Sequence, residues 1–150
     1  MKKLVAITVI ILLFSLDTMA QVEYKVITSV ESIVPAGLGR SRIISAEEER
    51  DYKEFTSEQT EDDNSRNKSK RSDIRVKDFE ETKLLNFYNL GGIRFQNIAA
   101  NDAVSSSKIN GMITDGCECA FVTSAVESDS GKDDGNGIFI TRYIFKRNNN

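Results

Sequence analysis

Two cysteines, Cys117 and Cys119, are the residues of this chain best suited to chemistry. In a regular β-strand their side chains point to one face, with Cα atoms about 6.6 Å apart. A disulfide needs Cβ atoms roughly 3.5–4.5 Å apart, so it would require a bulge just after Gly116. Three roles stay open for the pair: two small buried hydrophobic side chains, which we favour, a disulfide, or a thiol-dependent redox or metal-binding centre.

The absence of histidine closes several classes of chemistry. Ser-His-Asp and Cys-His catalysis, His-bound zinc and His-ligated haem all need an imidazole. Two thiolates supply only half of a tetrahedral zinc site, and no two acidic residues stand at a recognisable catalytic spacing. We therefore expect a protein that is not an enzyme, with no metal site and no cofactor.

Residues 37–42, with the sequence GLGRSR, contain a possible anion contact. Backbone N–H groups and the guanidinium groups of Arg40 and Arg42 suit an anion. The segment lacks the third glycine and the following helix of a dinucleotide-binding fingerprint. A turn with solvated arginines is the favoured interpretation.

The acidic segment 129–137 partly resembles a calcium-binding loop. Asp129 and Asp133 have the spacing of the first and fifth ligands of an EF-hand. Asp134 stands where that loop needs glycine, however, and Ile140 where it needs a bidentate glutamate. The segment is therefore predicted to be a polar hairpin turn.

Residues 1–20 have the pattern of a signal peptide. Lys2 and Lys3 precede an apolar run over 4–16, which is too short to span a bilayer as a helix. The small residues around Met19 suit a signal peptidase, so the mature chain is expected to begin at Gln21. We expect an exported protein, periplasmic or secreted, with no membrane span after cleavage.

The composition of the remaining chain fits one domain over 21–150. Of the whole sequence, 39% is hydrophobic and 29% charged, which suits a globular protein. The net charge of −3 argues against nucleic acid as a partner. An unknown protein or a small-molecule ligand remains as the expected partner.

Residues 46–73 differ in kind from the rest of the domain, because their only apolar side chains are Ala46, Tyr52 and Phe55. Nine acids and two bases lie in 47–63, and six bases and one acid follow in 64–77. So few apolar groups do not offset the entropy of ordering. The segment is predicted to be a mobile excursion, with acidic and basic limbs lying against each other as one possible form.

The hydrophobic pattern predicts an α+β fold, an antiparallel sheet of about four strands packed by one or two helices. Residues 79–90 fit a helix and a strand equally well. Asn101 and Asp102 are predicted to cap a helix that runs to about Thr114 and ends at Gly116. Strands are expected at 22–34, 40–45, 93–98, 117–126 and 138–146, the last two forming a hairpin.

Three segments together resemble a small bacterial domain family of unknown function. They are 23–27 (EYKVI), 108–122 (KINGMITDGCECAFV) and 143–147 (YIFKR). The family is marked by an E-Y-K-V-V start, an L-N-x5-G-W-E-L-V centre and an aromatic-K-R end, and it looks like a β-α-β-β unit. Cys117 replaces the family's tryptophan and Cys119 an aliphatic residue.

The whole chain is also similar to exported proteins of Bacteroidetes-type bacteria. The resemblance implies a fold and a compartment, and it implies no activity. The leading hypothesis is thus a small exported, non-catalytic binding or envelope accessory protein. The alternative is a thiol-dependent redox or metal-binding protein that uses Cys117 and Cys119.

Overall fold

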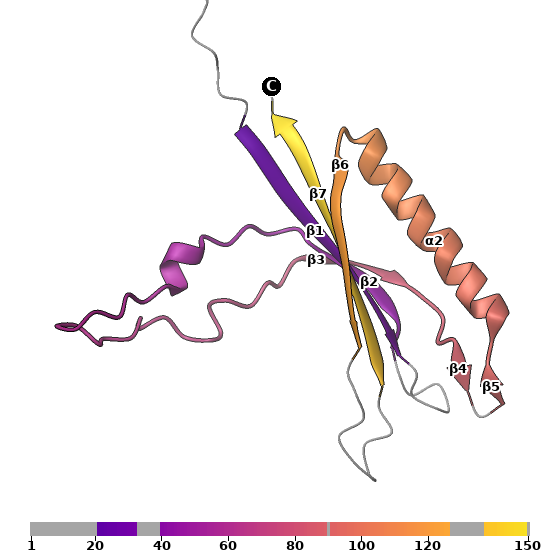
Figure 1. Cartoon of the computed structure of the whole chain (residues 1–150), viewed down its shortest axis with the longest axis horizontal. Helices are drawn as coiled ribbons and strands as arrows, with labels where there is room; N and C mark the ends of the chain where they lie inside the picture. The colour runs from indigo at the N-terminus through magenta and orange to yellow at the C-terminus, as the bar shows by residue number, and fades with distance from the viewer. Residues whose placement is uncertain (1–20, 33–39, 90, 127–136, 150) are drawn as a thin grey trace, which may run out of the picture.

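A computed structural model describes residues 21–32, 40–89, 91–126 and 137–149. Five antiparallel strands form one sheet in the order β3-β2-β1-β7-β6 (Figure 1). The first and last strands lie at its centre and pair in register from Gln21 opposite Asn149 to Ser32 opposite Ile138. Their alternating valines, isoleucines and aromatic residues favour a pleated, half-buried strand. The bounds are β1 Gln21–Ser32, β2 Arg42–Ala46, β3 Phe79–Lys83, β6 Glu118–Val126 and β7 Ile138–Asn149.

One face of the sheet is covered by α2, Phe95–Thr114, which follows a short hairpin of β4, Tyr88–Asn89, and β5, Gly92–Ile93. The helix ends as the sequence predicts, because Gly116 adopts a positive φ of 82°. The predicted start is wrong. The N-cap is Arg94, which makes no side-chain cap hydrogen bond, so the helix takes in most of the strand expected at 93–98.

The predicted fold class, about four strands packed by one or two helices, is also wrong. The main sheet has five strands, and the described residues are 41% strand and 22% helix with a single long helix. The extra strand is β3, which lies in the segment that fitted helix and strand equally well. Its partner β2 lies on the other side of the charged segment, so no local pattern shows the pairing.

The hydrophobic core lies between the sheet and α2. Ile27, Cys117 and Phe145 are buried there, and Ile109 and Met112 of the helix pack against them. Burial of these side chains provides the main free energy for holding the helix on the sheet. The face of the sheet that carries Ile27 and Phe145 is called the helix face below.

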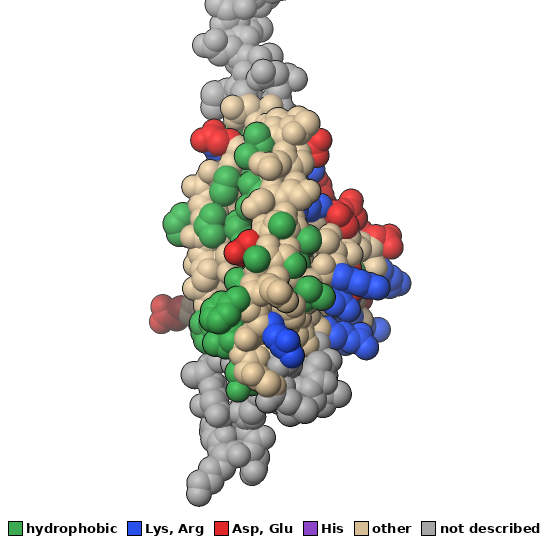
Figure 2. Space-filling model, turned by 90° about the vertical axis from the view of Figure 1, so that its right-hand side faces the viewer, with side chains coloured by type: hydrophobic (Ala, Val, Ile, Leu, Met, Phe, Trp, Pro, Cys, Tyr) green, Lys and Arg blue, Asp and Glu red, His purple; other side chains and the backbone are tan. Residues whose placement is uncertain are grey.

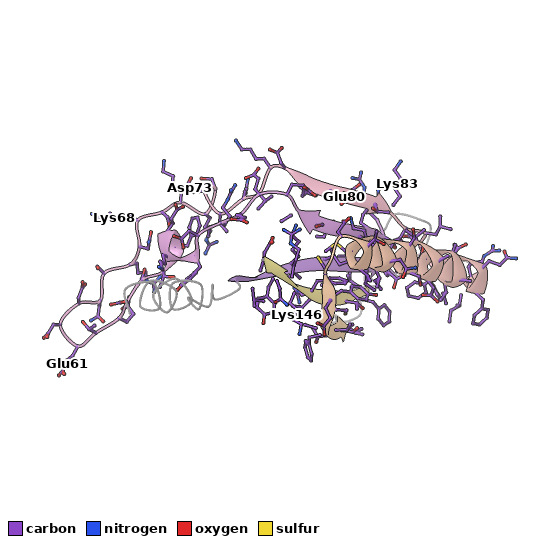
Figure 3. All side chains as sticks on the ribbon, turned by 90° about the horizontal axis from the view of Figure 1, so that it is seen from above. Glu61, Lys68, Asp73, Glu80, Lys83 and Lys146 are labelled. Carbon is purple, nitrogen blue, oxygen red and sulfur yellow. The ribbon has the colours of Figure 1, made fainter. Side chains whose placement is uncertain are left out.

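The charged segment between β2 and β3 projects from the sheet as a long arm, defined here as residues 47–78. It contains one short 3-10 helix, Tyr52–Phe55. The arm and α2 leave the sheet on opposite sides, as Figures 1 and 3 both show. Its predicted mobility stays a prediction.

Candidate binding surface on the open face of the sheet

The face of the sheet opposite α2 carries apolar side chains that the helix does not cover. Side chains alternate along a strand, so the neighbours of Ile27 and Phe145 point away from the helix. Val26 and Ile144 are such neighbours, and they pair with each other at the centre of the sheet. We call this surface the open face.

Five apolar residues form a row across the open face, one from each strand. Val26 pairs with Ile144, and Ile144 pairs with Phe121 on β6. On the other side Ala46 pairs with Phe79 and, with Val26, lines one groove. In strand order the row is Phe79, Ala46, Val26, Ile144 and Phe121. Exposed fractions are 51% for Phe79, 46% for Val26 and 60% for Phe121.

A bulge in β6 brings Phe121 to the open face. The register shifts between Cys119, which pairs with Phe145, and Phe121, which pairs with Ile144. Without this shift Phe121 would share the helix face with Cys119. The sequence predicts regular alternation with both residues on one face, and that prediction is wrong from Ala120 onward.

An apolar groove of about 400 Å³ lies at the β3 end of the row, where the arm leaves the sheet. Val76 of the arm forms one wall, and the open face provides the rest. The groove is wide open to solvent and has the size of a site for one or two side chains. It is lined by Val26, Thr28, Ile44, Ser45, Ala46, Val76 and Phe79.

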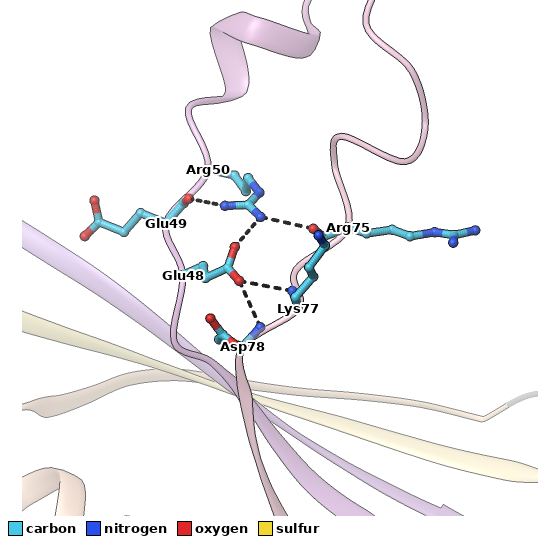
Figure 4. Close-up of polar contacts among 6 residues, drawn as sticks. All are labelled: Glu48, Glu49, Arg50, Arg75, Lys77 and Asp78. Carbon is cyan, nitrogen blue, oxygen red and sulfur yellow. Dashed lines mark hydrogen bonds and ion pairs between the residues drawn. The ribbon is translucent and has the colours of Figure 1, made fainter.

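The base of the arm is held by a cluster of hydrogen bonds shown in Figure 4. The Glu48 carboxylate accepts the main-chain N–H of Asp78 at 2.9 Å and that of Lys77 at 3.2 Å. Arg50 forms an ion pair with Glu48 and donates to the Arg75 carbonyl at 3.0 Å. The N–H of Asp78, followed by the Arg50 guanidinium, holds the pKa of the Glu48 carboxyl below its usual value.

Farther out, side chains tie the two limbs of the arm together. Asn67 donates through Nδ2 to the Glu54 carbonyl at 2.8 Å and to the Thr56 carbonyl at 3.2 Å. Gln59 donates to the Ser65 carbonyl at 3.2 Å. The limbs therefore lie against each other, as the sequence suggested. Charged side chains along the arm, such as Glu61 and Lys68, point into solvent (Figure 3).

Ion pairs flank the apolar row on the open face. Arg42 and Glu81 form one at 2.7 Å, and Lys146 and Glu118 form another at 3.1 Å. These charges pair with each other and leave the row itself uncharged. Exposed ion pairs of this kind contribute little to the free energy of unfolding. Their main effect is to give the apolar row a polar border.

The predicted thiol pair lies on the other side of the sheet. Cys117 is buried in the core, whereas Cys119 is exposed on β6, and both are free. Cys117 precedes β6, and the bulge lies beyond Cys119 rather than just after Gly116. The described residues contain no group of three or more acidic or cysteine side chains placed to hold a metal ion.

The structure does not bring the predicted anion contacts together into a site. Arg42 pairs with Glu81 and donates to the Ser41 carbonyl at 2.7 Å. Arg40 is exposed, and the glycines before it lie outside the described residues, as do 129–136 of the supposed calcium loop and the predicted signal peptide. In the part of the chain that is described, no helix has both the length and the apolar character to cross a bilayer.

Figure 2 views the molecule from the helix side and shows that its surface is divided. Hydrophobic side chains gather toward β6, and charged ones gather toward β3. Val122 and Val126 of β6 are exposed, as are Glu80 and Lys83 of β3. The apolar character of β6 therefore extends to both of its faces.

Sequence reasoning missed the open face, although a signal for it exists. Both faces of the segment 138–146 are apolar, with Ile138, Ile140 and Ile144 on one and Phe139, Tyr143 and Phe145 on the other. A strand that is apolar on both faces needs cover on both faces. A helix layer on one side of the sheet covers only one of these two faces.

No protein-family model matches this chain, and no curated protein or solved structure is significantly similar to it.

Proposed function

We propose that this chain is an exported, non-catalytic binding module whose open face holds a protein partner. The observation that carries the proposal is the apolar row, which crosses all five strands and stays half-exposed at Val26, Phe79 and Phe121. Exposed apolar patches beyond a few hundred Å² are uncommon on monomeric proteins and mark interaction sites.

A protein partner fits this surface better than a small molecule does. Small-ligand sites are concave and bury most of the ligand. The open face is broad, and its groove lies at one end of the row only. A protein surface can cover the whole row at once, which removes the most apolar area from water.

Export and the absence of catalysis are part of the same proposal. The basic, apolar and small-residue order of residues 1–20 supports export. The lack of histidine supports binding without chemistry, and the acidic balance of the chain disfavours nucleic acid as the partner.

The test is site-specific photo-cross-linking in the producing cell. A benzophenone amino acid replaces Val26 on the open face or Val122, which pairs with Tyr143 and so lies on the helix face. The two positions form a matched pair, because their exposed fractions are 46% and 47%. We expect a discrete adduct from position 26 and none from position 122.

The adduct is identified by its mass, and circular dichroism of both variants checks that they fold. If position 26 gives no adduct in a folded protein, or if both positions give the same adducts, the open face is not the binding surface and the proposal fails.

A further inference from the structure

We propose that the partner on the open face is a second copy of this chain, related by a two-fold axis parallel to the strands. This inference rests on the proposed function and names the occupant of the same surface. Two sheets that pack face to face keep their strands nearly aligned, about 10 Å apart. A two-fold axis along the strands satisfies that geometry and reverses the strand order of the second sheet.

The apolar row is self-complementary under this operation. From β3 to β6 it runs Phe, Ala, Val, Ile, Phe, and in reverse it runs Phe, Ile, Val, Ala, Phe. Val26 therefore faces Val26 of the second copy. The small Ala46 faces the larger Ile144, and an aromatic ring faces an aromatic ring at both ends. Large side chains opposite small ones are what interdigitating sheets require.

The groove at the base of the arm provides a place for Phe121 of the second copy. Phe121 is the most exposed of the large side chains in the row. After the rotation it lies over Phe79 and Ala46, which line the groove together with Val76. Symmetry gives two such insertions, one at each end of the interface, and buried aromatic anchors of this kind dominate binding energy.

The area of the open face matches what a stable dimer needs. The five strands have 12, 5, 5, 9 and 12 residues in chain order. With strands about 4.8 Å apart and a rise of about 3.3 Å per residue, the sheet covers roughly 700 Å². A standard interface buries about 800 Å² per partner. Contacts from the arm supply the remainder.

The same arrangement covers the exposed edge of the sheet. β6 is an edge strand in the described structure, and it carries no charge from Cys119 to Val126. Long, uncharged edge strands are prone to pair with other chains unless something shields them. Because the arm leaves the β3 end of the row on the open-face side, the rotation places it beside β6 of the second copy.

The experiment measures mass by light scattering after size-exclusion chromatography and by sedimentation velocity, over a range of micromolar concentrations. The purified wild-type protein, full mature chain, is expected at twice the mass of one chain. Val26→Glu puts two carboxylates against each other on the axis, so its mass is expected to fall by half. Val122→Glu, the matched control, keeps the dimer mass.

A milder pair of variants tests the groove. Phe121→Ala is expected to raise the dimer dissociation constant about tenfold or more, as loss of an aromatic anchor does. Phe95→Ala at the start of α2 removes another exposed ring from the helix side and leaves the dissociation constant unchanged. Circular dichroism establishes that all four variants fold.

Each other outcome overturns the second-copy proposal. A wild-type protein that is monomeric at every concentration overturns it. If position 26 of that monomeric protein still forms an adduct with a different protein, the proposed function stands and only the second-copy proposal fails. A dimer that survives Val26→Glu but dissociates with Val122→Glu assembles through the edge or helix face of β6. A monomer that also gives no adduct at position 26 overturns both proposals.

Discussion

The side-chain amide of Asn101 binds both main-chain groups of Leu85. The Leu85 N–H donates to Oδ1 at 2.8 Å, and Nδ2 donates to the Leu85 carbonyl at 2.8 Å. Nδ2 also donates to Glu31 Oε1 at 2.8 Å. Asn101 is only 3% exposed, so α2, β1 and the segment after β3 meet at one buried polar group. The residue predicted to cap the helix instead joins the helix to the sheet.

Replacement of Asn101 by leucine is expected to lower the free energy of unfolding by about 3 kcal/mol, because the N–H and carbonyl of Leu85 and the carboxylate of Glu31 lose a hydrogen-bond partner that is itself buried. Urea unfolding measures the change. Asn110→Leu, at an exposed position of the same helix, is the control and is expected to have little effect. Equal losses from both variants would contradict a special role for Asn101.

The two glycines at the end of α2 are expected to respond to alanine with opposite signs. Gly116 has a φ of 82°, which an alanine adopts at a cost of about 1 kcal/mol. Gly111 lies within the helix, where alanine is favoured by about 1 kcal/mol and its added Cβ meets nothing within 4 Å. Thermal unfolding should therefore show a lower melting temperature for Gly116→Ala and a higher one for Gly111→Ala. A stabilised Gly116→Ala would argue against the left-handed turn.

The base of the arm is expected to loosen in acid. The pKa of Glu48 is lowered in the folded protein, by the N–H of Asp78 and then by Arg50. The ionised carboxylate therefore stabilises the hydrogen-bond cluster at the base of the arm when the pH is above the ordinary pKa of glutamate. This stabilisation is lost as the pH falls through the lowered pKa. NMR titration of the Glu48 carboxyl carbon should give a midpoint below the ordinary pKa of a glutamate side chain.

Arg50→Gln is the matched variant for that titration, because it removes the charge and keeps an unbranched polar side chain. The Glu48 midpoint should move upward in this variant while the N–H of Asp78 still protects the carboxylate. An unchanged midpoint would mean that Arg50 does not pair with the Glu48 carboxylate in solution.

The two thiols are expected to differ in reactivity. Cys119 is exposed and should react with a disulfide reagent in the folded protein, whereas Cys117 is buried and should react only in denaturant. Cys119→Ser should remove the native-state reaction. Fast reaction of both thiols, or a wild-type mass two hydrogens light, would instead favour the thiol-dependent alternative.

Local patterns in the sequence predict the elements whose partners follow closely along the chain. The β6–β7 hairpin and the end of α2 at Gly116 belong to this group, since alternation and one glycine define them. The strand β3 does not belong to it, because the hydrophobic pattern of 79–90 fits a helix and a strand equally well. Its partner β2 also lies on the far side of the arm in the sequence. Tertiary pairing decided its conformation.

The candidate site was harder to predict than the fold. Phe121 reaches the open face only because β6 bulges, and nothing in the sequence around Ala120 marks a bulge. Asn101 was predicted to be a helix cap because asparagine is a good capping residue. Its side-chain amide instead binds the main chain of Leu85, sixteen residues earlier, in the segment that follows β3. Only the two apolar faces of the last strand pointed to an uncovered surface.

The pairing of the first strand with the last has a consequence for how the protein folds. β1 is synthesised before the other strands of the sheet, yet its long central partner β7, Ile138–Asn149, is synthesised after them. Contacts between distant parts of a chain slow folding, because the loop between them must close first. β7 also joins β6 to the other three strands. The sheet therefore stays incomplete until β7 has been synthesised, and loss of β7 would separate β6 from the other three strands.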